Sequence, residues 1–283
     1  LLDDINIKPD SIDGIIFVTM SPDYITPSTS CVLQDKLGLL KNTIAFDINL
    51  GCSGYVYGLY IACSLIQGGG LKRVLLLTGD TQTKMIHPKD KSVAFLFGDA
   101  GTATLVESEN CVPEIKMKLM TDGSRKDSLI VPAGGFRMPS TAGTRQVKKQ
   151  KDGGLRSLEH IYLDGMGVFN FSITDAVDTI RDFVDDENID LLNVDYLVLH
   201  QANKFMTDKI AKKLSFSPEK VPYSLTSYGN TSSASIPLTM AHCFSDLSGK
   251  THRCLLSGFG IGLSWGVIDI TMQNANYSKI VEI

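Results

Sequence analysis

The stretch "AFDINLGCSGYVYGLYIACSLIQGGG", residues 45–70, decides the fold class. It begins as a short apolar segment typical of a buried strand, predicted over 43–50. The chain then turns at Gly51-Cys52-Ser53-Gly54 and continues as an apolar segment with helical periodicity, predicted as a helix over 53–67. The glycines at 68–70 end that helix. A strand, a tight corner and a helix in this order predict one unit of an α/β protein.

The same alternation continues along the chain. Further buried strands are predicted at 12–20, 73–80 and 194–200. Pairs of strands joined by a glycine-containing bend or turn are predicted at 92–107 and 253–270. Helices are predicted at 26–39, 167–189, 202–214 and 232–247. Continuously apolar strands between helices predict mostly parallel sheets covered by helices. We therefore expect two duplicated α/β/α halves, 1–107 and 161–283, separated by an irregular segment over 108–160.

Composition excludes several classes of protein. The 283 residues carry a formal net charge of −4, which argues against nucleic-acid binding. Six cysteines stand singly without a CxxC pair, so neither a disulfide framework nor a zinc site is expected. No apolar run is long enough to cross a bilayer and no signal peptide opens the chain, so we expect a cytoplasmic protein. The chain begins at Leu1 without Met, and we expect that an N-terminal segment is missing.

Three polar side chains lie at positions where functional groups gather in an open parallel sheet. In open parallel sheets, functional groups gather beyond the carboxyl ends of the strands. Cys52 follows one strand at the start of a helix, where the free N–H groups favour a thiolate. His200 ends another strand and Asn230 lies in a turn before a helix, so the three together fit a thiolate nucleophile with a polarising pair. A buried apolar cysteine, a core histidine and a turn asparagine are the simpler interpretations, and pattern alone leaves both open.

Four segments containing these residues are similar to one known family. They are "GCSGYVYGL" (51–59), "HQANKFM" (200–206), "YGNTSSASIP" (228–237) and "GFGIGLSWG" (258–266). In this order they resemble β-ketoacyl-acyl-carrier-protein synthase III, a member of the thiolase-fold condensing enzymes. The resemblance implies a thiolase-like fold with mostly parallel mixed sheets in each half.

The resemblance also implies a mechanism. Cys52 would attack an acyl-coenzyme A and become acylated, and malonyl on an acyl carrier protein would then lose carbon dioxide. His200 and Asn230 would donate hydrogen bonds to the enolate oxygen, and the backbone N–H groups of Cys52 and Ile261 would bind the second oxyanion. The expected product is a 3-oxoacyl carrier protein in fatty-acid or polyketide synthesis. No bound cofactor, no metal and a homodimer are expected.

Other positions around the nucleophile either match or depart from the family pattern. By resemblance, Phe259 packs beside the sulfur, although core packing explains it equally well, and Gly260 and Gly262 shape the pocket. The family commonly has glycine where this chain has Ile261, so the pocket is expected to change shape. Thr26 stands where the family often has a bulky group, which suggests a roomier acyl pocket and a primer other than acetyl.

The remaining expected contacts involve lysines. Lys91 falls where the family often has an arginine that contacts the coenzyme A nucleotide. Lys204 and Lys209 are candidates for docking the acidic carrier protein, because the usual arginine of that helix is replaced here by Phe205. A solvated helix face is the simpler interpretation of these lysines.

Two other functions stay open. The first is an acyltransferase or thioester hydrolase that uses Cys52 without forming a carbon–carbon bond. The second is a non-catalytic paralogue that acts as a dimer partner, which would be expected to have lost Cys52, His200 or Asn230. The presence of the His200–Asn230 pair favours condensation.

Overall fold

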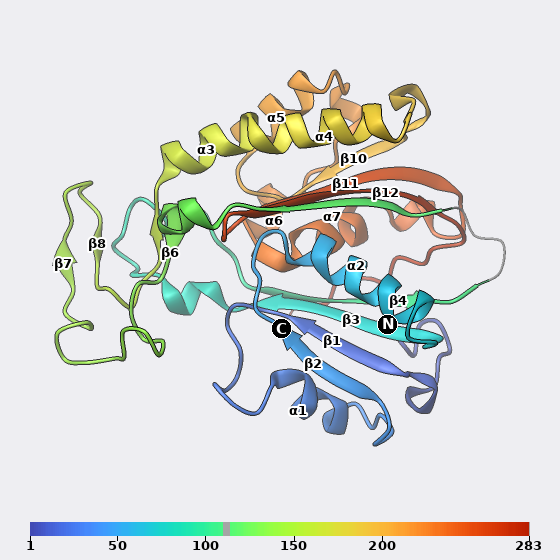
Figure 1. Cartoon of the computed structure of the whole chain (residues 1–283), viewed down its shortest axis with the longest axis horizontal. Coiled ribbons are helices and arrows are strands. Elements are labelled where there is room, and N and C mark those ends of the chain that lie inside the picture. The colour runs from blue at the N-terminus through green and yellow to red at the C-terminus, as the bar shows by residue number, and fades with distance from the viewer. Residues whose placement is uncertain (110–113, 283) are drawn as a thin grey trace.

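The computed structural model describes residues 1–109 and 114–282, which form a layered α/β protein built around two four-stranded sheets (Figure 1). The first sheet has the order β2-β1-β3-β4 and comprises β1 (Gly14–Val18), β2 (Ile44–Ile48), β3 (Arg73–Asp80) and β4 (Ala100–Glu107). Strands β1, β2 and β3 are parallel, and β4 is antiparallel to β3. The first half is therefore a mixed, mostly parallel sheet, as predicted.

The second sheet is also mixed, but two of its three strand pairings are antiparallel. Its order is β10-β11-β12-β5, with β5 (Lys116–Thr121), β10 (Tyr196–Leu199), β11 (His252–Gly260) and β12 (Ser264–Met272). As in the first sheet, a parallel pair, β10 and β11, continues into an antiparallel strand, β12. Two short antiparallel pairs lie outside the sheets: β6 (Leu129–Ile130) with β9 (Tyr162–Leu163), and β7 (Lys148–Lys149) with β8 (Leu155–Arg156). The predicted duplication of an α/β unit is confirmed.

Helices form the other layers (Figure 1). Between the two sheets lie α2 (Gly54–Gln67) and α7 (Ser235–Cys243), which contact both of them. The outer faces are covered by α1 (Thr29–Lys36) on the first sheet and by α3 (Gly165–Ile173), α4 (Asp175–Asp186) and α5 (Lys204–Lys213) on the second. Shorter helices are α6 (Leu225–Tyr228) and the 3₁₀ turns η1 (Pro9–Ser11), η2 (Gln82–Met85), η3 (Gly123–Ser128), η4 (Leu191–Asn193), η5 (Pro218–Lys220), η6 (Ser232–Ala234) and η7 (Ser245–Leu247).

Several predicted elements differ from the structure. The segment 108–160 is not irregular throughout, because 116–121 form β5 by pairing with β12, a partner distant in sequence. Of the two strands predicted within 92–107, only the second is present, as β4. In the region of the first, Phe97 forms an isolated parallel β-bridge with Asn230. The helix predicted over 167–189 is two helices, broken at Thr174, whose hydroxyl donates to the Asn170 carbonyl at 2.8 Å and competes with the backbone. The helix predicted over 232–247 is divided into η6, α7 and η7.

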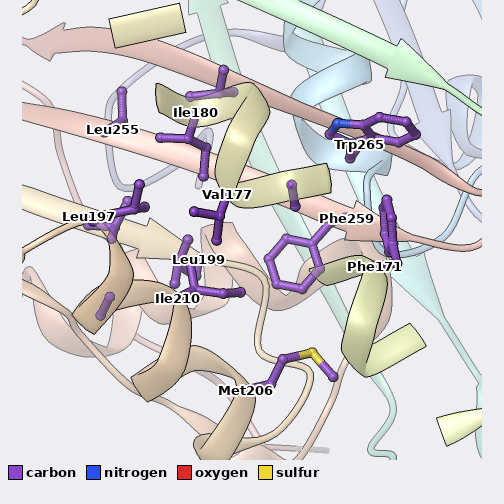
Figure 2. Packing of buried hydrophobic residues seen from close by; sticks show 14 of the residues in the cluster. Phe171, Val177, Ile180, Leu197, Leu199, Met206, Ile210, Leu255, Phe259 and Trp265 are labelled. Carbon is purple, nitrogen blue, oxygen red and sulfur yellow. The ribbon is translucent and has the colours of Figure 1, made fainter. Parts of the chain in front are cut away.

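The largest hydrophobic core lies between the second sheet and its outer helices (Figure 2). Helix α4 contributes Val177, Ile180 and Phe183, which recur at helical spacing and are almost completely buried. Trp265 of β12 closes one end of the core, and its indole N–H donates to Thr179 at 2.8 Å. Burying each such side chain stabilises the fold by about 1.5–3 kcal/mol.

The central helix α2 is buried against both sheets because its face carries glycine where β1 and β3 approach. A Cβ at Gly58 would lie 2.7 Å from Leu76 Cδ1 and 3.1 Å from Val18 Cγ2, and a Cβ at Gly54 would lie 2.4 Å from Val18 Cγ1. These glycines therefore set the distance between α2 and the first sheet. Within the described part of the chain, no helix, α2 included, is long and apolar enough to cross a membrane.

We expect Gly58→Ala to lower the free energy of unfolding by about 1–3 kcal/mol, because overpacking outweighs the higher helix propensity of alanine. Urea denaturation followed by circular dichroism measures the change. Gly165→Ala is the matched control, because a Cβ at this first residue of α3 meets no atom within 4 Å. If Gly58→Ala is as stable as the wild type, the close approach is not what holds α2 in place.

Candidate active site

The corner that carries Cys52 joins β2 to α2 and is fixed from both halves. The Gly54 amide donates to the Gly51 carbonyl at 2.7 Å and closes the turn before the helix. The hydroxyl of Ser53 lies 2.6 Å from that of Ser264 at the start of β12. Cys52 itself is only 4% exposed. The nucleophile candidate therefore lies where the two sheets meet.

The turn between β11 and β12 approaches Cys52 closely. A Cβ at Gly260 would lie 2.6 Å from Cys52 Cβ and 3.0 Å from its Sγ, and the φ angle there is +158°. A side chain at this position would displace the cysteine. The backbone amides of Ile261 and of Cys52 itself act to lower the pKa of the Cys52 thiol. The oxyanion hole that the resemblance assigns to these two N–H groups stays a prediction.

His200 follows β10 directly and is held from two sides. Its amide donates to the Ser257 carbonyl at 2.8 Å, which continues the pairing of β10 with β11. Ring atom Nδ1 lies 2.7 Å from the Ser235 hydroxyl at the start of α7. When Ser235 donates in this hydrogen bond, the neutral ring carries its proton on Nε2 and becomes a donor there. The ring also meets Phe259 edge to face, with centroids 5.5 Å apart.

Asn230 is oriented by the backbone around it. Its amide donates to the Leu96 carbonyl at 2.8 Å, and its own carbonyl accepts from Gln82 Nε2 at 2.7 Å. Its side-chain Oδ1 accepts the Ser232 amide at 2.9 Å. Because the oxygen is engaged in this way, Nδ2 is the end of the side chain left to donate to another molecule.

The electrostatics of the site correct one expectation. The sequence predicts a thiolate favoured by the helix start, but burial, followed by the negative charge of Asp80, raises the pKa of Cys52 to about 11. The Ile261 amide and the Ser232 hydroxyl lower the pKa without reversing the shift. Burial also lowers the pKa of His200 to about 3, opposed by the Ser232 backbone, so the ring is neutral at physiological pH. In the resting site, the thiol, the imidazole and the amide are all uncharged.

Not all predicted residues meet at this site. Phe259 is buried beside His200, and Gly262 follows Ile261 in the turn with a φ of +138°. Thr26 is exposed in the loop before α1, so its predicted role in the acyl pocket has no contact to support it. Lys91 is exposed in the loop after η2.

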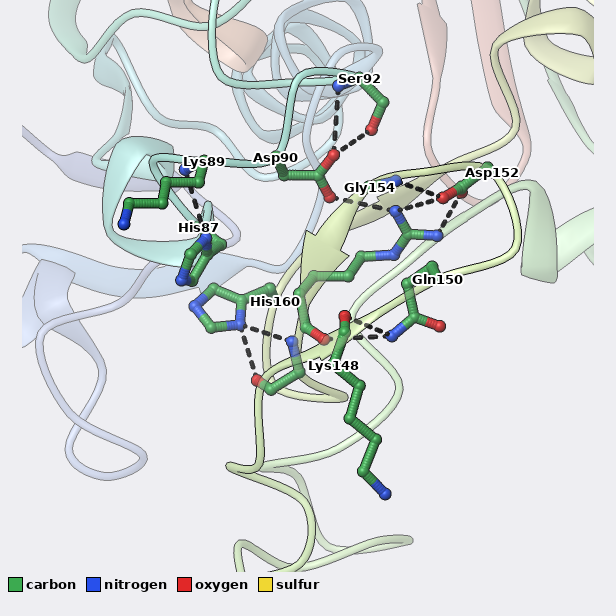
Figure 3. Close-up of polar contacts among 11 residues, drawn as sticks. His87, Lys89, Asp90, Ser92, Lys148, Gln150, Asp152, Gly154 and His160 are labelled. Atoms are coloured by element: carbon green, nitrogen blue, oxygen red, sulfur yellow. Dashed lines mark hydrogen bonds and ion pairs between the residues drawn. The ribbon is translucent and has the colours of Figure 1, made fainter.

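The loop that carries Lys91 is anchored by a buried ion pair (Figure 3). Asp90 accepts from the amide and hydroxyl of Ser92 at 3.1 and 2.6 Å and from Arg156 Nη1 at 3.0 Å. Arg156 also pairs with Asp152. Asp90 and Arg156 therefore fix the loop against the β7–β8 hairpin while the Lys91 side chain stays in solvent.

The helix predicted to dock the carrier protein presents its lysines unequally. Lys204 forms an ion pair with Asp208 at 2.9 Å and lies over the Tyr223 ring. Lys209 lies 5.3 Å from the centre of the Phe205 ring. In the described residues it has no carboxylate partner. Of the two lysines, Lys209 is therefore the one whose positive charge is available to an acidic partner.

Sequence reasoning missed three polar residues next to Cys52 and His200: Asp80, Ser232 and Ser235. Asp80 ends the predicted strand 73–80. The expectation that functional side chains lie at the carboxyl ends of parallel strands, which located His200, therefore also indicates Asp80. The serines lie in the quoted run after Asn230, but that pattern does not reveal which hydroxyl faces which group. No cluster of three or more His, Cys, Asp or Glu suited to a metal ion occurs among residues 1–109 and 114–282.

Comparisons with known proteins agree with this fold. The family model of 3-oxoacyl-[acyl-carrier-protein] synthase III matches residues 46–123, and the model of its C-terminal part matches 184–272. The β-ketoacyl-[acyl-carrier-protein] synthase III of Streptococcus gordonii is 36% identical over 276 residues, covering 96% of this chain and 81% of the relative. The crystal structure of a 3-oxoacyl-(acyl-carrier protein) synthase from Burkholderia xenovorans has a TM-score of 0.91 at 39% identity, covering 98% of this chain and 78% of that one.

A more distant structure has the same architecture. The priming β-ketosynthase of the R1128 polyketide pathway has a TM-score of 0.79 at 26% identity, covering 96% of this chain and 78% of its own. Fold and relatives together define an acyltransferase of the thiolase-fold condensing class. Within that class, the chain belongs to the 3-oxoacyl-[acyl-carrier-protein] synthase III family. The sequence resemblance is confirmed.

Because the pKa of Cys52 is raised to about 11, we expect its alkylation by iodoacetamide to accelerate about tenfold per pH unit between pH 7 and pH 10. Peptide mass spectrometry separates Cys52 from the exposed Cys31 and Cys243, and Cys52→Ser is the blank. A rate that levels off below pH 9 would show that the thiolate is already favoured at rest.

Proposed function

We propose that this chain catalyses the decarboxylative condensation of an acyl-coenzyme A primer with malonyl on an acyl carrier protein, giving a 3-oxoacyl carrier protein. One observation supports the proposal: Ser232 connects the three residues, because it affects the pKa of both Cys52 and His200 and its amide donates to Asn230 Oδ1 at 2.9 Å. Membership of the synthase III family supports it.

Acyl transfer to Cys52 is the first step. The sulfur attacks the thioester carbonyl, and the carbonyl oxygen takes up negative charge as the tetrahedral intermediate forms. The amides of Cys52 and Ile261 donate to that oxygen, which replaces water with fixed donors in a buried site. Coenzyme A then leaves as its thiol, and the acyl group stays on Cys52.

Decarboxylation of the malonyl group follows and produces an enolate. His200 Nε2 and Asn230 Nδ2 donate to the enolate oxygen. Two neutral donors favour this step because they interact most strongly with the charge that develops in the transition state. The low pKa of His200 keeps it a hydrogen-bond donor without turning it into a competing acid. The enolate carbon then attacks the acyl group on Cys52, and the same backbone amides stabilise the second oxyanion. When this intermediate collapses, the bond between the acyl carbon and the Cys52 sulfur breaks, which releases the 3-oxoacyl carrier protein and frees Cys52.

The primer and the carriers are recognised by residues around this centre. Ile261 places its Cγ2 atom over Gly51, where a Cβ would lie only 2.9 Å away, so its side chain narrows one wall beside Cys52. Lys209 provides a positive charge for the acidic carrier protein, and the exposed Lys91 provides one for the coenzyme A phosphates. These contacts would set the order of events: primer first, malonyl carrier second.

We expect a panel of acyl-coenzyme A thioesters to leave an acyl adduct on Cys52 in the wild type and none on Cys52→Ser, as measured by intact-protein mass spectrometry. A chase with malonyl carrier protein converts the adduct into a 3-oxoacyl carrier protein. His200→Ala and Asn230→Ala retain the adduct but lose at least about a hundredfold in the chase, because the donors act on the enolate.

Lys209→Glu is the docking variant in the same assay. This variant is expected to slow only the reaction with malonyl carrier protein, and a higher concentration of that carrier restores the rate. Lys148→Glu on the exposed β7 strand is the charge-matched control. An adduct that the chase leaves unchanged would indicate simple acyl transfer. The absence of any adduct would remove Cys52 as the nucleophile.

We further propose that two copies of this chain form the active enzyme, as the sequence resemblance implies. Light scattering after size exclusion is expected to give twice the mass of the 30.8 kDa chain. A mass of one chain under conditions of full activity would contradict the dimer.

A further inference from the structure

Ser235 carries a buried hydroxyl that the steps above leave without a role. It is the first residue of α7 and is only 1% exposed. Its hydroxyl lies 2.7 Å from His200 Nδ1, and His200 is equally buried. Neither group can exchange this partner for water, so the hydrogen bond is a fixed part of the folded protein. The side chain that the proposed chemistry uses as a donor is therefore held through its opposite ring nitrogen.

The hydroxyl of Ser235 is directed at His200 and not at its own helix. Serine and threonine in helices commonly donate to the carbonyl four residues earlier. Ser172 in α3 donates in this way to Val168 at 2.7 Å, and Thr239, one turn further along α7, donates to the Ser235 carbonyl at 2.7 Å. The Ser235 hydroxyl makes its hydrogen bond across the site instead. Its contact with the imidazole is thus specific to this position and does not serve the helix.

The backbone that carries Ser235 is anchored on the first sheet. Two residues earlier, the hydroxyl and the amide of Ser233 donate to Oδ2 of Asp80 at 2.6 and 3.2 Å. Asp80 ends β3 and is 3% exposed, and its Oδ1 accepts the Met20 amide at 2.8 Å. A buried carboxylate therefore holds the turn before α7, and the Ser235 hydroxyl has a defined position before any substrate arrives.

The direction of the hydrogen bond follows from counting hydrogens. A serine hydroxyl has one hydrogen, and burying it without an acceptor is costly. If Nδ1 carried the ring proton, the Ser235 hydrogen would need another acceptor, but within residues 1–109 and 114–282 this hydroxyl has no second partner. If Ser235 donates to Nδ1, both groups are satisfied and the ring proton lies on Nε2. The Ser232 backbone also acts on the pKa of the ring, but no second ring hydrogen bond is formed in the described part of the chain.

We propose that Ser235 is a positioning residue for the decarboxylation step: it donates to His200 Nδ1 and thereby keeps the ring proton on Nε2, where it faces the enolate oxygen. This inference rests on the proposed function and extends it to a residue that acts through His200. In the opposite tautomer, Nε2 would present a lone pair to the enolate oxygen and repel the developing charge. A neutral imidazole does not select its own tautomer, so the neighbouring hydroxyl determines which nitrogen is the donor.

The role of Ser235 is confined to one of the two steps. In the scheme above, acyl transfer to Cys52 uses backbone amides and no donor on His200, whereas decarboxylation requires the Nε2 proton. Because that proton interacts most strongly with charge that develops in the transition state, loss of Ser235 lowers the rate at saturating malonyl carrier protein more than it weakens binding of the carrier.

The tautomer of His200 tests the proposal without any substrate. Two-bond proton–nitrogen NMR spectra of the protein with isotope-labelled histidine distinguish a protonated from an unprotonated ring nitrogen, and His200→Gln assigns the signal among the five histidines. At pH 7, where a pKa of about 3 keeps the ring neutral, the wild type is expected to carry its proton on Nε2. In Ser235→Ala we expect a mixture of both tautomers. A wild-type ring that is protonated on Nδ1 would overturn the proposal.

Ser235→Ala also separates the two steps in the adduct assay. Acylation of Cys52 by an acyl-coenzyme A is expected to stay within about twofold of wild type, whereas the chase with saturating malonyl carrier protein slows about tenfold, as for the net loss of one hydrogen bond. Ser172→Ala is the matched control, because this serine is equally buried but donates within its own helix. An unchanged chase, or an equal loss in both steps, would contradict the proposal.

The proposed function can fail separately from this inference. A wild type that is never acylated, or whose adduct the chase leaves unchanged, refutes the condensation whichever nitrogen of His200 carries the proton. A wild type that condenses but carries the proton on Nδ1 refutes only the role of Ser235.

Discussion

The burial of α2 between two sheets is the constraint on which the rest of the structure depends. A helix covered on both sides leaves no polar face, which explains why its sequence is apolar over most of its length. Glycine at 54 and 58 allows the close approach to the first sheet, and the Ser53–Ser264 contact ties its first turn to the second. Because Cys52 immediately precedes this helix, the packing that stabilises the core also places the sulfur at the junction of the two halves.

Burial also sets the chemistry of the site. It raises the pKa of Cys52 and lowers that of His200, so the resting groups are neutral and the charge nearby belongs to Asp80. Donors fixed by the backbone in a buried site need little reorganisation when a negative charge develops on a substrate oxygen. The start of α2 provides free backbone amides, but it does not make Cys52 a thiolate at rest. Activation of the sulfur therefore depends on where its proton goes, not on a low pKa at rest.

The sequence predicted the parts of this arrangement that follow from local rules. Apolar runs located the parallel strands, and their carboxyl ends located Cys52, His200 and Asn230, whose catalytic roles stay predictions. Sequence patterns failed to predict the features that depend on contacts between residues distant in sequence. Strand β5 exists because β12 pairs with it, and the Cys52 pKa rises because the folded protein buries the sulfur and places Asp80 near it. The position of Ser235 behind His200 and of Ser232 beside Asp80 likewise appears only after folding.

The division of the site between the two sheets has a consequence for the way the protein is made. During synthesis, Cys52 and α2 leave the ribosome before the β11–β12 turn that supplies Ile261. Until that hairpin inserts between α4 and the central layer, the cysteine lacks both its cover and its second amide donor. In a partly made chain the Cys52 thiol is therefore not yet buried, and the site is complete only when β11 and β12 have joined the second sheet.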